Sequence, residues 1–209
     1  MVSLSIKCKP SVEVLKSLMD IIEEVNVKTI YFDKSLAYPI RIEIEGEFEW
    51  MIKELERNEA VESIRVGKSF DQVYGKRVLV YGWGAQISQV VLGAVTEADR
   101  HNIRGERISI DTIPVIGDAL REAIFSTSDL PRASILVLAC AVLDRELENA
   151  IKKLKEETDI PIIALNSIGG GKELADLIVT DPVQAGVMAV MAVADTALFD
   201  IKKIRKKKF

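Results

Sequence analysis

The stretch "LVYGWGAQISQVV", residues 79–91, decides how this chain is expected to fold. It passes from an apolar run into Gly82-Trp83-Gly84 and then directly into a helical pattern. A strand that turns through glycines into a helix is the opening unit of many α/β domains, and the turn often binds a phosphate or a nucleotide. The stretch therefore predicts a strand, a tight turn and a helix, with a candidate ligand site at the turn.

The same alternation continues along residues 77–201. The segment 133–142 is apolar on both faces, which is typical of a strand in a parallel sheet covered by helices on both sides. Five expected strands of this kind predict an α/β domain with a flavodoxin-like or Rossmann-like parallel sheet. The expected strands are 77–82, 107–116, 133–142, 161–166 and 176–180, and the expected helices are 85–102, 118–125, 144–158 and 182–201.

The first 68 residues follow a different plan. Their periodicity predicts the order β-α-β-β-α-β, which is the ferredoxin-like α+β arrangement of an antiparallel sheet with both helices on one face. Ten of the twelve glycines fall at or after Gly75, and residues 67–77 lack clear periodicity. We therefore expect an N-terminal domain at 1–68, a linker at 69–76, the α/β domain at 77–201 and a basic tail at 202–209.

Residues 41–66, "RIEIEGEFEWMIKELERNEAVESIRV", resemble the second half of an ACT domain. The resemblance implies an ACT-like fold for the first 68 residues, a homodimer formed through this half, and an amino-acid effector at the turn between the first strand and the first helix. That turn is here Lys9-Pro10-Ser11, with Ser11 where the family usually has glycine and no acidic residue before Pro10. The whole arrangement is also similar to uncharacterised archaeal proteins that join an ACT domain to an α/β domain.

Composition narrows the class of protein. The net charge is −4 although residues 202–208 carry six positive charges, so the body is acidic and broad nucleic-acid binding is not expected. The most apolar segment, 185–194, is ten residues long, whereas a membrane span needs about 20. Cys8 and Cys140 lie in strand-like runs, unlike the cysteines of a disulfide-stapled secreted domain. These features predict a cytoplasmic protein that does not enter a membrane.

Ligands of open parallel sheets bind beyond the carboxyl ends of the strands. Because glycines there expose backbone N–H groups, and a lysine adds positive charge, the sequence predicts that a small anionic metabolite binds along this edge. The residues expected to bind it are Gly82, Trp83, Gly84, Gly117, Gly169, Gly170, Gly171 and Lys172.

Neither glycine motif is a complete nucleotide fingerprint. Gly82-x-Gly84 is followed by Ile87 where a dinucleotide site has its third glycine, and no acidic residue ends the second strand. The alternative is a tight turn in which Trp83 packs against the sheet or the N-terminal half. In "NSIGGGKELAD", residues 166–176, the spacing of a P-loop is absent, and a flexible connecting loop is the alternative to an anion site.

Three carboxylates at the same edge are candidates for acid/base chemistry: Asp118, Asp144 and Asp181. All three stand where helix N-caps are expected, and capping alone explains an aspartate there. Asp195, in the expected final helix, is predicted to pair with a basic group, to reach a site, or simply to be exposed at the helix end. His101 is the only histidine, so a multi-histidine metal site is not expected. No cofactor is expected either.

The sequence leads to a regulatory or ligand-sensing protein as the first hypothesis. In it the ACT-like half dimerises and binds an amino acid, and the α/β half binds the anionic metabolite. The alternative is a small metabolic enzyme that acts on a phosphorylated or carboxylated substrate, with one of the three aspartates as acid/base. A third hypothesis is a subunit whose ACT-like half mainly forms an interface.

Overall fold

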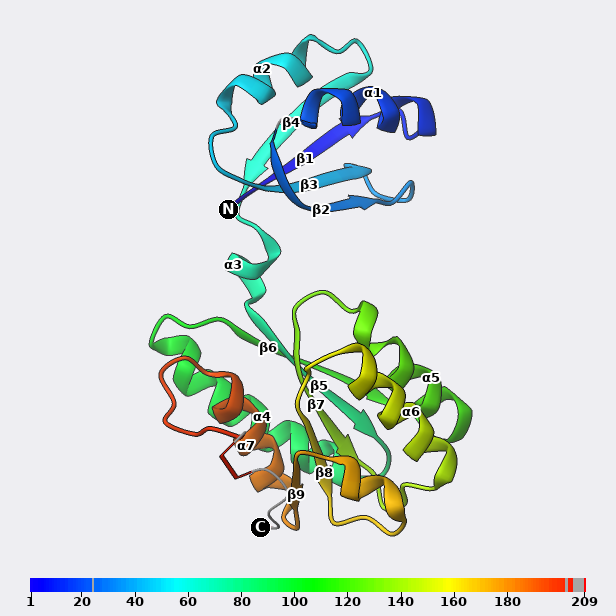
Figure 1. Cartoon of the computed structure of the whole chain (residues 1–209). Coiled ribbons are helices and arrows are strands. Elements are labelled where there is room, and N and C mark those ends of the chain that lie inside the picture. The colour runs from blue at the N-terminus through cyan, green and yellow to red at the C-terminus, as the bar shows by residue number, and fades with distance from the viewer. Residues whose placement is uncertain (24, 202, 205–208) are drawn as a thin grey trace. The chain divides into compact units, whose positions relative to one another are not determined.

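The computed structural model describes residues 1–23, 25–201, 203–204 and 209. The chain divides into two compact units, Met1–Val73 and Tyr74–Phe209, which we describe separately (Figure 1). Most of the predicted basic tail, residues 202 and 205–208, lies outside the described residues.

The first unit is built on an antiparallel sheet of four strands in the order β2-β3-β1-β4. The predicted order of elements is the one observed. In chain order they are β1 (Val2–Cys8), α1 (Val12–Ile22), β2 (Asn26–Phe32), β3 (Ile40–Glu45), α2 (Glu49–Arg57) and β4 (Val61–Gly67).

Alternation along the strands separates the two faces of this sheet. Ile40, Ile42 and Ile44 are fully or almost fully buried in a core that includes residues of both α1 and α2. Arg41 and Glu43 point to the opposite face, because successive side chains of a strand alternate. The helices therefore cover one face only (Figure 1).

The segment after β4 packs on the other face of the sheet. The N–H of Phe70 donates to Glu43 Oε1 (2.7 Å), and the Arg41 guanidinium lies 3.7 Å from the centroid of the Phe70 ring. Arg41 also pairs with the buried Glu43 (3.4 Å). These contacts fix the start of α3 (Phe70–Tyr74), which lies within the predicted linker.

The second unit is an α/β domain with five parallel strands in the order β6-β5-β7-β8-β9. This is the order of flavodoxin-like folds and confirms the predicted parallel sheet. The elements are β5 (Lys76–Gly82), α4 (Ala85–Ile103), β6 (Ile108–Pro114), α5 (Gly117–Phe125), β7 (Ala133–Ala139), α6 (Arg145–Glu157), β8 (Ile162–Leu165), β9 (Leu177–Val179) and α7 (Pro182–Val193), with 3₁₀ turns at Ser126–Asp129 and Gly170–Leu174.

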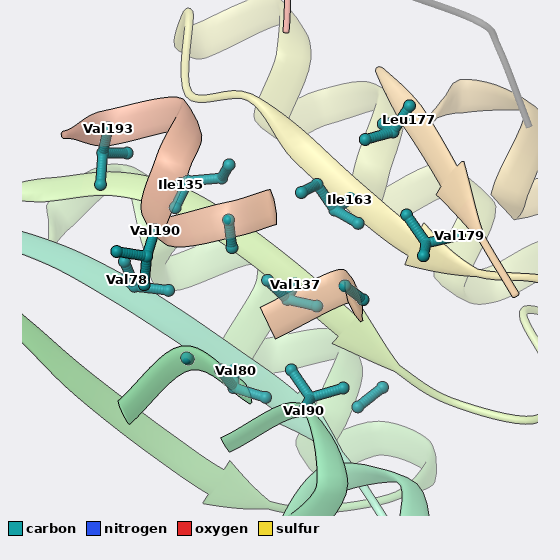
Figure 2. Close-up of a cluster of buried hydrophobic side chains, with 14 of the residues drawn as sticks. Val78, Val80, Val90, Ile135, Val137, Ile163, Leu177, Val179, Val190 and Val193 are labelled. Atoms are coloured by element: carbon teal, nitrogen blue, oxygen red, sulfur yellow. The ribbon is translucent and has the colours of Figure 1, made fainter. Parts of the chain in front are cut away.

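Helices cover both faces of the parallel sheet. Val78 and Val80 of β5 belong to the core shared with α4 and α7, part of which Figure 2 shows. Leu79 and Tyr81 of the same strand belong to the core shared with α5 and α6. Fully buried strands of this kind explain the near-continuous apolar runs in the sequence.

Helices α4 and α7 approach each other closely at two glycines. A Cβ on Gly93 would lie 2.0 Å from the carbonyl oxygen of Val183, and a Cβ on Gly186 would lie 2.0 Å from that of Val90. Both distances are far below van der Waals contact, so this packing requires glycine at both positions.

The final helix is shorter than predicted. The periodicity predicted a helix over 182–201, but α7 ends at Val193 and Ala194 has an extended backbone (φ −69°, ψ 132°). The helix ends here because Glu106 accepts the N–H groups of Asp195 and Thr196, which a continuing helix would use internally. None of the helices in the described part of the chain is long and apolar enough to cross a membrane.

Candidate ligand crevice at the edge of the parallel sheet

The carboxyl ends of three strands meet at one point of the sheet edge. Gly82, the last residue of β5, pairs with Pro114 of β6 on one side and with Ala139 of β7 on the other. The chain passes from β5 to β6 on one side and then to β7 on the other, so the strand order reverses here. In open α/β sheets this switch point is the usual place for a ligand.

A crevice with a volume of about 510 Å³ lies at this point. The loop after β5 contributes Trp83, and the β6–α5 connection contributes Ile116, Gly117 and Asp118. The loop after β7 and the start of α6 contribute Val142, Asp144 and Glu146. Arg121, one turn into α5, completes the polar wall. The structure therefore brings together Trp83, Gly117, Asp118 and Asp144 of the residues predicted from sequence.

Gly82 has a structural reason for being glycine. Its φ is 153°, and a Cβ at this position would lie 2.0 Å from the carbonyl oxygen of Ala139. The N–H of Val115 donates to Gly82 O (2.9 Å), which ties the ends of β5 and β6 together. Trp83, which follows, is half-buried: it packs on the α5/α6 core and also lines the crevice.

The three candidate aspartates have different roles. Asp144 Oδ1 accepts the N–H groups of Glu146 (3.1 Å) and Leu147 (3.0 Å), so it caps α6. Asp181 caps α7 through the N–H of Gln184 (2.7 Å). The expectation of a cap is wrong for Asp118, because Ile116 occupies the N-cap position of α5 and makes no side-chain cap bond. Asp118 pairs instead with Arg121 (3.1 Å).

The crevice wall carries charges of both signs. Arg121 favours a negatively charged group on the ligand. The start of α5 does so too, because its cap residue Ile116 makes no side-chain hydrogen bond to the first N–H groups of the helix. The carboxylates of Asp118, Asp144 and Glu146 favour a positive group or a hydrogen-bond donor. Arg121 and Glu146 were not found from the sequence, because a charged residue on an amphipathic helix is normally part of a solvated face.

The glycine-rich loop has a packing role. A Cβ on Gly169 (φ 106°) would lie 2.0 Å from the carbonyl oxygen of Leu143, and the N–H of Gly171 donates to that same oxygen (3.4 Å). The loop thus packs against the β7–α6 connection. Neither Lys172 nor the three glycines are among the residues that line the crevice, so anion binding by this loop stays a prediction.

The predicted effector turn lies in the first unit. Ser11 Oγ accepts the N–H of Val14 (3.2 Å) and caps α1, while Lys9 and Pro10 are exposed. Capping gives Ser11 a structural role. Amino-acid binding at Lys9, Pro10 and Ser11 stays a prediction.

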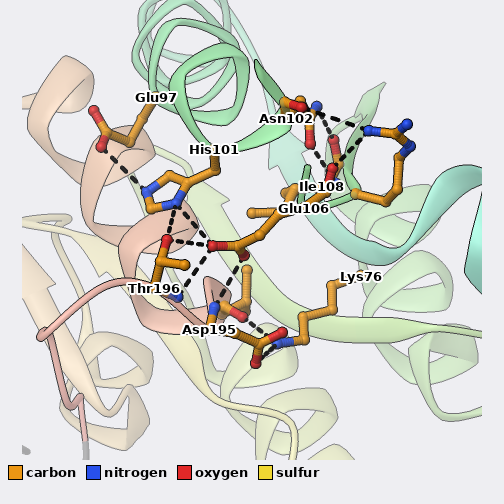
Figure 3. A network of polar contacts seen from close by, with 10 residues as sticks. Lys76, Glu97, His101, Asn102, Glu106, Ile108, Asp195 and Thr196 are labelled. Atoms are coloured by element: carbon orange, nitrogen blue, oxygen red, sulfur yellow. Dashed lines mark hydrogen bonds and ion pairs between the residues drawn. The ribbon is translucent and has the colours of Figure 1, made fainter. Parts of the chain in front are cut away.

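A polar network lies at the amino ends of the parallel strands, where Lys76 begins β5 (Figure 3). His101 Nδ1 lies 3.1 Å from Glu106 Oε1 and 3.0 Å from Thr196 Oγ1, and His101 is almost fully buried. Asp195 pairs with Lys76, the first residue of β5, and this confirms one of the three alternatives predicted for it. This network stands at the amino ends of the strands and fixes the chain after α7, so we assign it a structural role.

Glu106 is the centre of that network. Burial raises the pKa of its carboxyl, but hydrogen bonds from Thr196, Asp195 and His101 outweigh this effect and hold the pKa at about 2, below the ordinary 4.5. The sequence did not single out Glu106, because its partners Asp195 and Thr196 are about 90 residues away along the chain.

The buried thiol at the carboxyl end of the sheet is not a nucleophile. Cys140 is fully buried, and burial raises the pKa of its thiol to about 12. A thiol with such a pKa stays protonated and unreactive at neutral pH. Within the described residues, no group of three or more histidine, cysteine, aspartate or glutamate side chains could hold a metal ion.

Comparison with known proteins places the second unit in a family. A family model described as "Domain of unknown function (DUF5612)" matches residues 67–208. The chain belongs to this family. The DUF5612 chain is similar to "Uncharacterized protein MJ1458" of Methanocaldococcus jannaschii, with 43% identity over 98% of this chain and 97% of that protein. It is also similar to an "Uncharacterized protein" of Archaeoglobus fulgidus, with 41% identity over 84% of this chain and 79% of that protein. The relatives are thus uncharacterised archaeal proteins, as the sequence indicated.

Two solved structures illustrate a loose resemblance to this DUF5612 chain. One is described as a periplasmic ribose ABC transporter from Conexibacter woesei, with a TM-score of 0.40 and 20% identity, and the match covers 51% of this chain and 35% of that one. Another is a 3-dehydroquinate dehydratase-like protein from Bifidobacterium longum, with a TM-score of 0.36 and 11% identity, covering 57% of this chain and 95% of that one. Scores this low carry no inference about ligand or activity.

Proposed function

We propose that this DUF5612 protein is a ligand-sensing protein whose α/β unit binds an amino-acid-like zwitterion in the crevice. The observation that carries the proposal is the crevice itself, which lies at the switch point of the sheet and combines Arg121 with Asp118, Asp144 and Glu146. An anionic group on this ligand would lie against Arg121 and the start of α5.

The opposite charges of the wall select the rest of the ligand. Asp118 and Arg121 form an ion pair with both side chains partly exposed (78% and 46%), so the pair can open and exchange partners. An α-ammonium group beside a carboxylate presents the complementary pair of charges. Trp83, Ile116 and Val142 provide the apolar surface that holds the remainder of a small molecule.

The first unit is proposed to be a ferredoxin-like, ACT-like dimerisation domain. The β-α-β-β-α-β order, the antiparallel strand order β2-β3-β1-β4 and the single helix-covered face support this assignment. Val12 and Met19 lie two turns apart on α1 and are exposed by 50% and 39%. They form an apolar strip that a second copy would cover. Regulation would then be a coupling between ligand binding and the dimer.

We expect the protein to sediment as a dimer, at twice the 23.2 kDa mass of the chain. Met19→Glu should shift it to the monomer, because the new charge would be buried in the interface. Leu36→Glu, at a loop position that is 57% exposed, is the matched control and should stay dimeric. A wild-type protein that is monomeric at micromolar concentration in sedimentation equilibrium would contradict the dimer.

Trp83 provides the test of the crevice. The chain has two tryptophans, so a Trp50→Phe protein reports on Trp83 alone. Titration with α-amino acids should change its fluorescence saturably, whereas N-acetylated amino acid amides, which lack both charges, should not. Arg121→Gln should weaken binding about tenfold, the loss expected for one charge-assisted hydrogen bond.

Arg100→Gln is the matched control for Arg121→Gln. Arg100 pairs with Glu97 in the last turn of α4 and is 65% exposed, so its replacement also removes one positive charge from a helix surface. Equal affinity in both variants would sink the assignment of Arg121. Binding of the neutral derivatives as tightly as the zwitterions would sink the proposed ligand class.

The alternative function is an enzyme with Asp118 as its acid/base. The observation that favours it is specific: of the three predicted aspartates, Asp118 alone lines the crevice without capping a helix. Asp118→Asn would then abolish turnover of a crevice-bound carboxylated or phosphorylated substrate while leaving its binding within a few fold. Asp144 and Asp181 contribute to helix caps in either case.

A further inference from the structure

A second cavity continues the crevice along the outer surface of the α/β unit. It also has a volume of about 510 Å³ and lies between α5 and α6. Arg121 and Glu146 line both cavities, so the two form one elongated site. Together they have far more volume than the zwitterionic head of an amino acid fills.

The walls of this groove are suited to an alkylammonium group. Among the described residues, Glu122 on α5 and Glu146 on α6 line the groove and have no ion-pair partner within 4.0 Å. Phe125 supplies an exposed ring, and the Nζ of Lys153 lies 3.8 Å from its centroid. The protein's own lysine thus shows that an ammonium group can lie over this ring.

The net charge of the whole site also favours a ligand with an additional positive charge. Asp118, Asp144, Glu122 and Glu146 line it together with only two cationic side chains, Arg121 and Lys153. The walls are therefore net negative by two formal charges. A simple neutral zwitterion leaves this charge uncompensated, and a dicarboxylate would increase the repulsion.

We infer that the ligand is an α-amino acid with a long cationic side chain, the chemical class that includes lysine and ornithine. This inference rests on the proposed function, which places the zwitterionic head in the crevice. The side chain extends along the groove over Phe125, and its ammonium group lies between Glu122 and Glu146. Lys153 competes with the ligand for the face of the Phe125 ring.

Three probes separate the parts of the ligand: L-lysine, L-norleucine and cadaverine. Norleucine keeps the head and chain of lysine without the terminal ammonium, and cadaverine keeps both amines without the carboxylate. In the Trp50→Phe protein, lysine should bind at least about tenfold more tightly than either analogue, because each lacks one charged contact.

Variants at the groove test the same contacts from the protein side. Glu122→Gln should weaken the binding of L-lysine about tenfold and leave the affinity for norleucine unchanged. Lys153→Ala should increase the affinity for L-lysine severalfold, because it removes a half-exposed cation that competes with the ligand. Lys152→Ala, on the same helix but paired with Glu148 and outside the groove lining, is the matched control and should have no effect.

The outcomes distinguish the groove from the crevice. If norleucine binds as tightly as lysine and Lys153→Ala changes nothing, the groove inference is overturned while the proposed function stands. If cadaverine binds as tightly as lysine, the assignment of the carboxylate to the crevice fails. If no α-amino acid perturbs Trp83, the proposed function and the inference fail together.

Discussion

Gly93→Ala and Gly186→Ala are each expected to lower the free energy of unfolding of the second unit by about 3 kcal/mol, at the upper end of overpacking effects. At an ordinary helix position the same change stabilises by about 1 kcal/mol, so the sign is diagnostic. It reverses here because each new methyl carbon would lie 2.0 Å from a carbonyl oxygen of the facing helix. Urea unfolding followed by Trp83 fluorescence in the Trp50→Phe background measures this unit.

Leu92→Ala is the control for both variants. Leu92 lies on α4 and is 61% exposed, so its replacement should leave the stability of the second unit nearly unchanged. A Gly93→Ala protein as stable as the wild type would mean that α4 and α7 are farther apart than described.

Glu106→Gln is expected to lower the free energy of unfolding at neutral pH. It should also make that free energy less dependent on pH in the acid range. The pKa of this carboxyl is about 2 in the folded protein, against an ordinary value of 4.5. A lowered pKa contributes stability that is present above the unfolded value and is lost as pH falls toward the folded value. The wild type should therefore lose about 2 kcal/mol from this group between pH 4.5 and 2.

Glu156→Gln, on an exposed position of α6, is the control for the Glu106 variant. Its denaturation midpoints should follow those of the wild type throughout the acid range. A Glu106→Gln protein with the same neutral stability and the same acid slope as the wild type would show that this carboxylate does not hold the segment after α7.

The sequence predicted the parallel α/β fold of the second unit because the signals for it are local. Continuous apolar strands and the turn at Gly82 indicate a parallel sheet. The ends of these strands then locate the edge at which Trp83 and Asp118 both line the crevice. The cap roles of Asp144 and Asp181 follow from position alone.

What the sequence missed depends on contacts between distant residues. The end of α7 is set by Glu106, which no helical period reveals. Gly93 and Gly186 must be glycine because the backbone of the facing helix, α7 or α4, lies too close for a side chain. Arg121 and Glu146 enter the crevice because of how α5 and α6 pack, and a helical pattern alone assigns both to solvent.

The most direct test of the crevice is an NMR titration of the full-length protein labelled with ¹⁵N-tryptophan. The chain has two tryptophans, so the indole region contains two signals, and Trp50→Phe assigns them. We predict that L-lysine shifts the Trp83 indole signal saturably and leaves the Trp50 signal in place. If the Trp83 signal stays in place at saturating amino acid, or both signals move together without saturating, the crevice is not the binding site and the account is wrong.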